Sequence, residues 1–135
     1  MKFRRRHYRP QVDQMDCGVT SLAMVFGYYG SHYSLAHLRE LAKTTMEGTT
    51  AFGLVRVADK LNFETRTIRA DMSLFEHNDL TYPFVAHVVK NGKLLHYYVV
   101  TGQDKKFIHI ADPDPTVKMT KLPREHFESE WTGVA

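Results

Sequence analysis

The segment QVDQMDCGVTSLAMVFGYYG, residues 11–30, places the only cysteine of the chain at the start of an apolar helical pattern. Asp13 or Asp16 can cap a helix that begins near Cys17, and Gly30 can end it. The apolar residues recur at the spacing of one helix face: Val19, Leu22, Ala23, Val25 and Phe26. The thiol is therefore predicted at a helix N-terminus, where unpaired backbone N–H groups and the helix dipole stabilise a thiolate.

The composition indicates an ordinary globular protein. A chain of 135 residues fits one domain with its own core, and 43% hydrophobic and 24% charged residues argue against disorder. A single cysteine cannot form an intramolecular disulfide, which fits a reducing compartment and leaves the thiol free for chemistry. Residues 18–37 carry no Lys, Arg, Asp or Glu, but their Gly, Tyr, Ser and His content favours a half-buried helix and turn over a membrane span. We therefore expect a soluble domain.

The hydrophobic period changes halfway along the chain. Two more helices are predicted, over 35–41 with Ser34 as its cap and over 51–61 with Thr49 or Thr50 as its cap. Strands are then predicted over 63–70, 84–89, 94–101 and 107–111, and a short closing helix over 123–131. The predicted fold class is α+β, with N-terminal helices, the first carrying the cysteine, packed on a C-terminal antiparallel sheet.

The turn signals predict which residues of the sheet face one another. A two-residue turn at Asn91-Gly92 would place His87 opposite His96. A three-residue loop over 103–105 would place His96 opposite Asp112. Opposed side chains on one face lie about 4.5–5.5 Å apart at Cβ, close enough for an imidazole–carboxylate hydrogen bond.

These residues satisfy the requirements of a thiol hydrolase. Cys17 would be the nucleophile, His96 the base that forms an ion pair with it, and Asp112 the carboxylate that orients the imidazole. The Gln11 amide and the Cys17 backbone N–H would stabilise the oxyanion, although the residues alone do not distinguish Gln11 from Gln14.

Each of these residues also has an ordinary structural interpretation. A lone cysteine is most often a small buried hydrophobe, and a histidine in an apolar strand is usually a satisfied core residue. Asp112 before a proline is typical of a turn, and a glutamine such as Gln11 is typical of a loop.

Three motifs in order carry a family resemblance: QVDQMDCG (11–18), HYYVV (96–100) and IADPDP (110–115). The whole chain closely resembles the N-terminal peptidase domain of ABC transporters that process bacteriocins and quorum-sensing peptides. These double-glycine leader peptidases are papain-like cysteine proteases. The resemblance implies Cys17 as nucleophile, His96 as general base and acid, Asp112 as orienting carboxylate and Gln11 as oxyanion donor. It also implies that residues 1–135 are one peptidase domain of a longer transporter.

The resemblance further implies the substrate and partners. The family cuts a precursor after two glycines and exports the mature peptide, and its leader forms an amphipathic helix that would need an apolar groove. Candidate groove residues, each of which could instead be core, are Met15, Met46, Phe52, Leu54, Tyr97 and Tyr98. The expected partners are this leader and the transmembrane and nucleotide-binding domains of the same transporter, with the peptidase on the cytoplasmic side of a bacterial cell membrane. No cofactor, metal or nucleic acid is expected, because no ligand spacing or basic stripe occurs. His87, the one histidine expected beside His96, is interpreted as structural.

A basic arm over residues 1–9 accounts for the local charge excess, through Lys2, Arg4, Arg5, Arg6 and Arg9. Three interpretations are open: a solvated tail, a contact with acidic lipids or with the cytoplasmic face of the transporter, and nucleic-acid binding, which is the least favoured. Two other functions also remain open, another Cys-His-Asp thiol hydrolase or acyltransferase and a non-catalytic domain that only recruits cargo.

Overall fold

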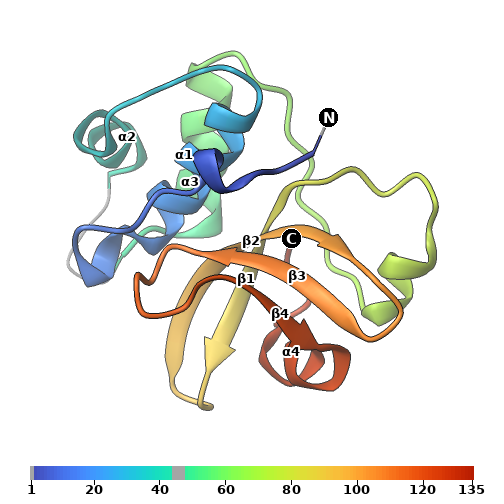
Figure 1. Cartoon of the computed structure of the whole chain (residues 1–135). Coiled ribbons are helices and arrows are strands. Elements are labelled where there is room, and N and C mark those ends of the chain that lie inside the picture. The colour runs from blue at the N-terminus through green and yellow to red at the C-terminus, as the bar shows by residue number, and fades with distance from the viewer. Residues whose placement is uncertain (1, 44–47) are drawn as a thin grey trace.

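The computed structural model describes residues 2–43 and 48–135. Three of the four helices form one side of the molecule and a four-stranded sheet the other (Figure 1). The helices are α1 (Cys17–Tyr28), α2 (Leu35–Ala42), α3 (Ala51–Lys60) and the short C-terminal α4 (Arg124–Glu130). The strands are β1 (Phe84–Lys90), β2 (Leu94–Gln103), β3 (Phe107–Asp112) and β4 (Lys118–Pro123), antiparallel and adjacent in chain order. Three 3₁₀ turns are η1 (Arg5–His7), η2 (Gln14–Asp16) and η3 (Met72–Glu76). The α+β prediction is confirmed.

The helix caps explain where the helices begin. Ser34 Oγ accepts a hydrogen bond from His37 N at the start of α2, and Thr50 Oγ1 accepts one from Gly53 N at the start of α3. At α1 the capping is indirect. Asp13 caps the 3₁₀ turn η2, which leads into α1 without a side-chain cap from Asp16. The start of α1 at Cys17 is confirmed.

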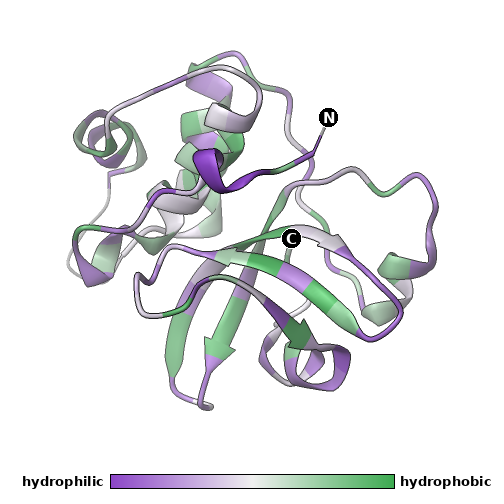
Figure 2. Cartoon of the chain, in the orientation of Figure 1, coloured by the Kyte–Doolittle hydropathy of each residue, from purple (hydrophilic) through white to green (hydrophobic). Residues whose placement is uncertain are grey.

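Both faces of the sheet are covered by apolar side chains. Helix α1 packs across β2, so that Val19 and Phe26 lie in a core with Tyr97. The opposite face carries Val88, Tyr98, Val100, Ile108 and Ile110, which pack with Phe75 and Phe127 of η3 and α4. Figure 2 shows mostly hydrophobic colour along the strands, and hydrophilic colour at the N-terminal turn, in the loops and on α4. Within the described residues, no helix has the length and apolarity that a membrane span needs.

The first hairpin forms at the predicted turn but in a different register. Asn91 and Gly92 both have positive φ, and Lys93 N donates to Lys90 O at 3.0 Å. The ladder resumes one residue later, with Lys90 opposite Leu94, so Lys93 belongs to the loop. The predicted pairing of His87 with His96 is therefore wrong. His87 faces Tyr97, and His96 faces Val88.

The second hairpin also differs from the prediction. Strand β2 continues to Gln103, so the turn lies over 104–106, where the Asp104 carboxylate accepts from the backbone N–H of Lys106 and Phe107. A register shift between Val100 and Gly102 moves the pairing again. Val99 faces Ala111, so the same register places Asp112 beside Tyr98 and diagonally from His96. The predicted direct opposition of His96 and Asp112 is wrong, but diagonal neighbours on one face remain within reach.

Two other segments differ from the prediction. Residues 63–70 do not form a strand of the sheet. Ile68 exchanges backbone hydrogen bonds with Ala135, and Ala70 N donates to Gly133 O, which is too short a pairing for a ladder. Strand β4 was not predicted because its residues are mostly exposed and polar, as expected for an edge strand.

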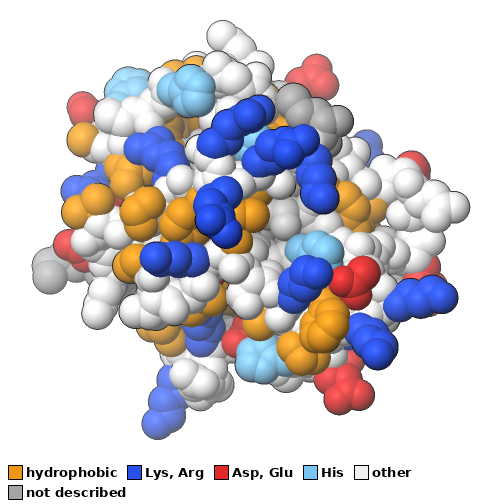
Figure 3. All heavy atoms as spheres, viewed as in Figure 1, with side chains coloured by type: hydrophobic (Ala, Val, Ile, Leu, Met, Phe, Trp, Pro, Cys, Tyr) orange, Lys and Arg blue, Asp and Glu red, His pale blue; other side chains and the backbone are white. Residues whose placement is uncertain are grey.

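The basic arm is anchored rather than a free tail. Phe3 is buried beside Met24 and Tyr28, while Arg4, Arg5 and Arg6 are exposed. Figure 3 shows Lys and Arg side chains gathered over the face that carries this arm.

Candidate active site

Cys17 lies at the N-terminus of α1, on a cleft of about 800 Å³ between the helices and the sheet. Its side chain is 8% exposed and forms no disulfide. The cleft is also lined by Met15, His87, Leu95 and Tyr97. The thiol thus reaches an open cleft from a helix start, where the dipole favours a thiolate.

His96 and Asp112 form a buried pair. His96 Nε2 lies 2.6 Å from Asp112 Oδ1, and the two residues are 5% and 0% exposed. The carboxylate fixes the ring through Nε2 and leaves Nδ1 for other partners. The contact predicted from the sequence is therefore present, reached through the diagonal arrangement.

Asp112 has polar partners at both carboxylate oxygens and at its backbone oxygen. Lys90 Nζ lies 2.5 Å from its Oδ2, Asp114 N donates to its Oδ1 at 2.9 Å, and the Tyr8 hydroxyl donates to its backbone oxygen at 2.7 Å. A buried carboxylate needs such partners to stay ionised. The residue that orients His96 is consequently fixed by two segments distant in the chain, through Lys90 and Tyr8, and by its own turn through Asp114 N.

The surroundings of His96 favour its charged form. Burial by itself lowers the pKa of His96, but hydrogen bonding and charge interactions with Asp112 and Cys17 outweigh it and raise the pKa to about 9. The imidazole is therefore protonated at neutral pH. This arrangement supplies an imidazolium partner for a Cys17 thiolate.

His87, on the same cleft, has the opposite electrostatics. Burial lowers its pKa, and its Nδ1 lies 3.1 Å from the Thr132 hydroxyl oxygen. Its ring lies 4.9 Å from the Tyr97 ring. A neutral, hydrogen-bonded histidine in this place fits the structural role that we expected for His87.

Gln11 lies next to the turn that follows Asp112. Its backbone N–H donates to Pro113 O at 2.8 Å, and its buried Oε1 accepts no hydrogen bond within the described part of the chain. Gln14, in contrast, lines the cleft on which Cys17 lies. The structure brings Gln11 to the Asp112 side of the site and Gln14 to the cleft side.

An ion pair precedes the nucleophile position. Asp16 is fully buried, and Arg39 of α2 binds both carboxylate oxygens, at 2.9 Å from Nε and 2.5 Å from Nη2. A bidentate pair of this kind has a fixed geometry. It therefore ties α2 to the turn from which Cys17 emerges. The sequence reasoning missed this pair, although an acidic residue directly before the cysteine was a visible signal.

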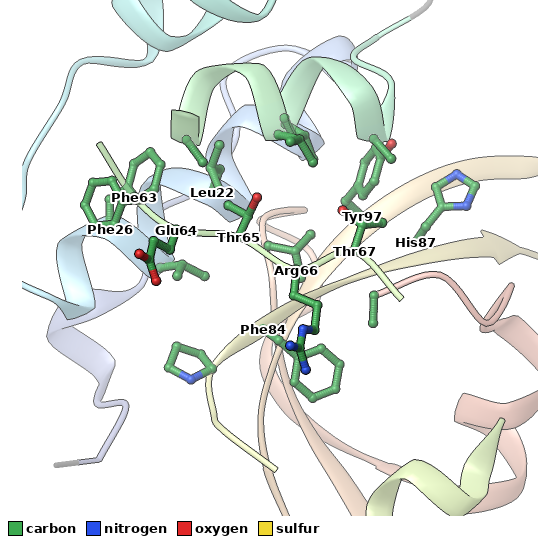
Figure 4. A pocket seen from close by; sticks show the side chains of 18 of the residues that line it. Leu22, Phe26, Phe63, Glu64, Thr65, Arg66, Thr67, Phe84, His87 and Tyr97 are labelled. Atoms are coloured by element: carbon green, nitrogen blue, oxygen red, sulfur yellow. The ribbon is translucent and has the colours of Figure 1, made fainter. Parts of the chain in front are cut away.

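An apolar groove of about 360 Å³ continues from the cleft. Cleft and groove share Ala51, His87, Tyr97 and Val134. Figure 4 shows Phe26 and Phe63 at one end of the groove and Tyr97 and His87 at the other. The Phe26 and Phe63 rings are stacked with centroids 4.3 Å apart.

The candidate groove residues are distributed unevenly. Leu54 and Tyr97 line the groove, and Met15 lines the cleft. Phe52 is 70% exposed beside an adjoining pocket that shares Phe63 with the groove. The structure places Tyr98 elsewhere, because it is fully buried on the other face of the sheet and donates to Glu130. Met46 lies outside the described residues.

Lys90 is the site residue that the sequence reasoning missed entirely. The predicted register treated it only as the last residue before a turn. In the predicted register, with His87 opposite His96, Lys90 would lie on the other face of the sheet, so no signal in the sequence pointed to it. Within the described ranges, no group of three or more His, Cys, Asp or Glu side chains is arranged to hold a metal ion.

Comparisons with known proteins show the family to which this fold belongs. The model of the peptidase C39 family matches residues 5–135. The transport/processing ATP-binding protein ComA of Streptococcus pneumoniae strain R6 is 80% identical over 134 residues, which are 99% of this chain and 19% of ComA. The chain thus spans about a fifth of the length of this curated relative.

The solved structures that resemble this chain are also peptidase domains. The crystal structure of the peptidase domain of Streptococcus ComA, a bifunctional ABC transporter involved in quorum sensing, has a TM-score of 0.90 and 57% identity, covering 93% of this chain and 92% of that one. A double-glycine-motif protease from an AMS/PCAT transporter, solved with its leader peptide, has a TM-score of 0.83 and 27% identity, covering 94% of this chain and 86% of that one. The predicted papain-like peptidase fold is confirmed. The chain belongs to the peptidase C39 family of cysteine peptidases.

Proposed function

We propose that this chain is the peptidase domain of a peptide exporter and cleaves the leader from a secreted precursor after a Gly-Gly motif. The observation that carries the proposal is the buried His96–Asp112 pair beside a cysteine at a helix N-terminus. The names of its relatives, which describe transport and processing, support the coupling of cleavage to export. The precursor would be a quorum-sensing or competence peptide, or a bacteriocin.

In the proposed mechanism, the Cys17 thiolate is the nucleophile, and His96 is an imidazolium that holds the proton. The sulfur adds to the carbonyl carbon of the second glycine, and the carbonyl oxygen becomes an oxyanion. We assign its stabilisation to the Cys17 backbone N–H and to the Gln11 side-chain amide. His96 then protonates the leaving amine, and a thioester remains on Cys17.

Water completes the reaction. His96, now neutral, takes a proton from the water that attacks the thioester carbonyl, and the thiolate leaves to regenerate the ion pair. Asp112 accepts the hydrogen bond from His96 Nε2 throughout and keeps the imidazole in one orientation. Two glycines before the cut fit a narrow approach to Cys17 that excludes a Cβ.

The leader would bind outside the reacting centre. We propose that its amphipathic helix lies in the apolar groove of Figure 4, with Leu54 and Tyr97 as contacts. The extended Gly-Gly end would then pass over Tyr97 into the Cys17 cleft, because Tyr97 lines both. This places the affinity in the groove and the bond cleavage in the cleft.

The rest of the exporter is also part of the proposal. Because the chain corresponds to 19% of its ComA relative, we propose that transmembrane and nucleotide-binding domains complete the functional protein, with the peptidase on the cytoplasmic side. The precursor, made in the cytoplasm, would meet the peptidase before it is exported.

The test is incubation with a synthetic precursor that carries a leader, a Gly-Gly motif and several following residues, analysed by mass spectrometry. We expect one cut directly after the second glycine, none with Cys17→Ala, and leader binding by that variant within about twofold of the native chain. Binding without any cleavage by the native chain would instead favour a docking domain. A cut elsewhere, or no preference for Gly-Gly, would favour another thiol hydrolase.

A further inference from the structure

Lys90 is a nearly buried cation on the far side of the carboxylate that orients His96. Its side chain is 16% exposed, and its Nζ contacts Asp112 Oδ2 at 2.5 Å while Oδ1 contacts His96 Nε2 at 2.6 Å. The three groups therefore form a line of cation, carboxylate and imidazole. Nothing in the reaction described above uses the cation directly.

The sheet brings this line together. Lys90 ends β1, His96 lies near the start of the central strand β2, and Asp112 ends β3. Lys90 and Asp112 thus flank β2 on its two sides, and each is a diagonal neighbour of His96 on one face. The one-residue offset after the first hairpin turn gives Lys90 this position, because Lys90 faces Leu94.

We propose that Lys90 is a positioning residue of the active site, which fixes the Asp112 carboxylate against His96 and sets the pH range of the thiolate–imidazolium pair. The inference rests on the proposed roles of Cys17, His96 and Asp112. A carboxylate alone behind His96 would hold its proton too strongly for transfer to the leaving amine. The Lys90 charge offsets part of that attraction and keeps His96 an effective acid.

The other groups around this line do not supply the same charge. The Tyr98 hydroxyl donates to Glu130 of α4, and burial and nearby carboxylates raise the pKa of Tyr98, so it stays neutral. Tyr8 is neutral for the same reasons, with a pKa raised to about 12. The remaining titratable groups that face the line are Cys17 of α1, Asp114 after β3, and Lys118 of β4, the exposed sheet partner of Asp112. Among the described residues, Lys90 is thus the cation that contacts Asp112 in addition to the His96 imidazolium.

The test compares charge with hydrogen bonding at position 90. Lys90→Gln can still donate a hydrogen bond to Asp112 but carries no charge, and Lys90→Arg keeps the charge. Lys93→Gln is the matched control, since Lys93 is an exposed lysine in the same hairpin. The measurement is kcat/KM for the synthetic precursor between pH 5 and 10, with thermal melting of each variant.

We expect Lys90→Gln to move the alkaline limb of the pH profile upward by about one pH unit. The reason is that removing the Lys90 charge leaves the Asp112 carboxylate free to stabilise the His96 imidazolium more strongly. Lys90→Arg and Lys93→Gln should leave that limb within about 0.3 pH unit of the native position. An unmoved limb in Lys90→Gln, with only a lower kcat, would overturn the proposal and make Lys90 a structural residue.

A second measurement does not depend on cleavage. The ring protons of His96 can be followed by NMR during a pH titration of the native chain and of Lys90→Arg and Lys90→Gln. The midpoint should rise in Lys90→Gln by the same amount as the alkaline limb, and an unchanged midpoint would contradict the proposal. A native chain that does not cleave at all would refute the proposed function, while the NMR titration would still decide the role of Lys90.

Discussion

Asp112→Asn should convert an active site that works over neutral and mildly alkaline pH into one that fails as the pH rises. The substitution keeps the size of the side chain and removes the charge that faces His96 Nε2 at 2.6 Å. The interactions with Asp112 and Cys17 raise the pKa of His96 to about 9 against the opposing effect of burial. Without the carboxylate, only the Cys17 interactions oppose burial, and we expect the pKa to return to about its ordinary value of 6.5.

The magnitude follows from these two values. A fall in pKa of about 2.5 corresponds to about 3 kcal/mol of lost preference for the imidazolium. At pH 7 the protonated fraction of His96 falls from nearly all to about a quarter, and the ring also loses its orientation. We therefore expect kcat/KM to fall about 10²–10³-fold at pH 7. Since the native imidazolium persists to about pH 9, the ratio of native to variant activity should rise about 40-fold further between pH 7 and pH 9.

The assay is a fluorescence-quenched precursor cleaved across this pH range, with KM measured separately. Asp114→Asn is the control, because its side chain caps the following turn through Thr116 and only its backbone contacts Asp112. It should change kcat/KM less than threefold. A loss in Asp112→Asn that is the same at every pH, or an equal loss in Asp114→Asn, would refute the reasoning.

Three further predictions concern the oxyanion donor, the backbone and the pH dependence of stability. Gln11→Ala should lower kcat about 10²–10³-fold with little change in KM, whereas Gln14→Ala should not, as measured with the same precursor. Gly133→Ala should lower the free energy of unfolding in urea by about 1–3 kcal/mol, because φ is +94° and a Cβ would lie 2.8 Å from Ala70 O. Gly92→Ala, with positive φ but open space, should cost about 1 kcal/mol or less. Because the pKa of His96 is raised on folding, its stabilising effect is complete below about pH 6.5 and is lost as the pH rises through about 9. The melting temperature of His96→Gln should accordingly fall less over this range than that of the native chain.

Much of the fold follows from local patterns in the sequence. The caps at Ser34 and Thr50 and the helix start at Cys17 depend on residues within one turn, which a sequence displays directly. The strand register does not follow from local patterns. The shift at Val100–Gly102 and the Asp104 turn add single-residue offsets, which the hydrophobic periodicity of the sequence does not reveal.

The candidate site shows the same division. The contact between His96 and Asp112 was predicted correctly despite the wrong register, because both residues lie on one face of neighbouring strands. Lys90 was missed because its contact with Asp112 spans two strand pairs and depends on the offset after the first turn. Residues 63–70 alternate like a strand, but the backbone hydrogen bonds of Ile68 and Ala70 go to the few residues around Gly133, far along the chain.

The hydrogen bond from the Tyr8 hydroxyl to the Asp112 carbonyl joins residues 104 positions apart. Gln11 N and Pro113 O make a second such link beside it. Contacts of this sequence separation form late and slowly, because the chain must lose the conformational entropy of a long loop before the contact can stabilise the fold. During synthesis Cys17 emerges nearly a hundred residues before Asp112. The hydrogen bonds of Tyr8 and Gln11 can form only after β3 has left the ribosome. Proteolytic competence should therefore appear last, so that an incomplete chain exposes a thiol but no functioning peptidase.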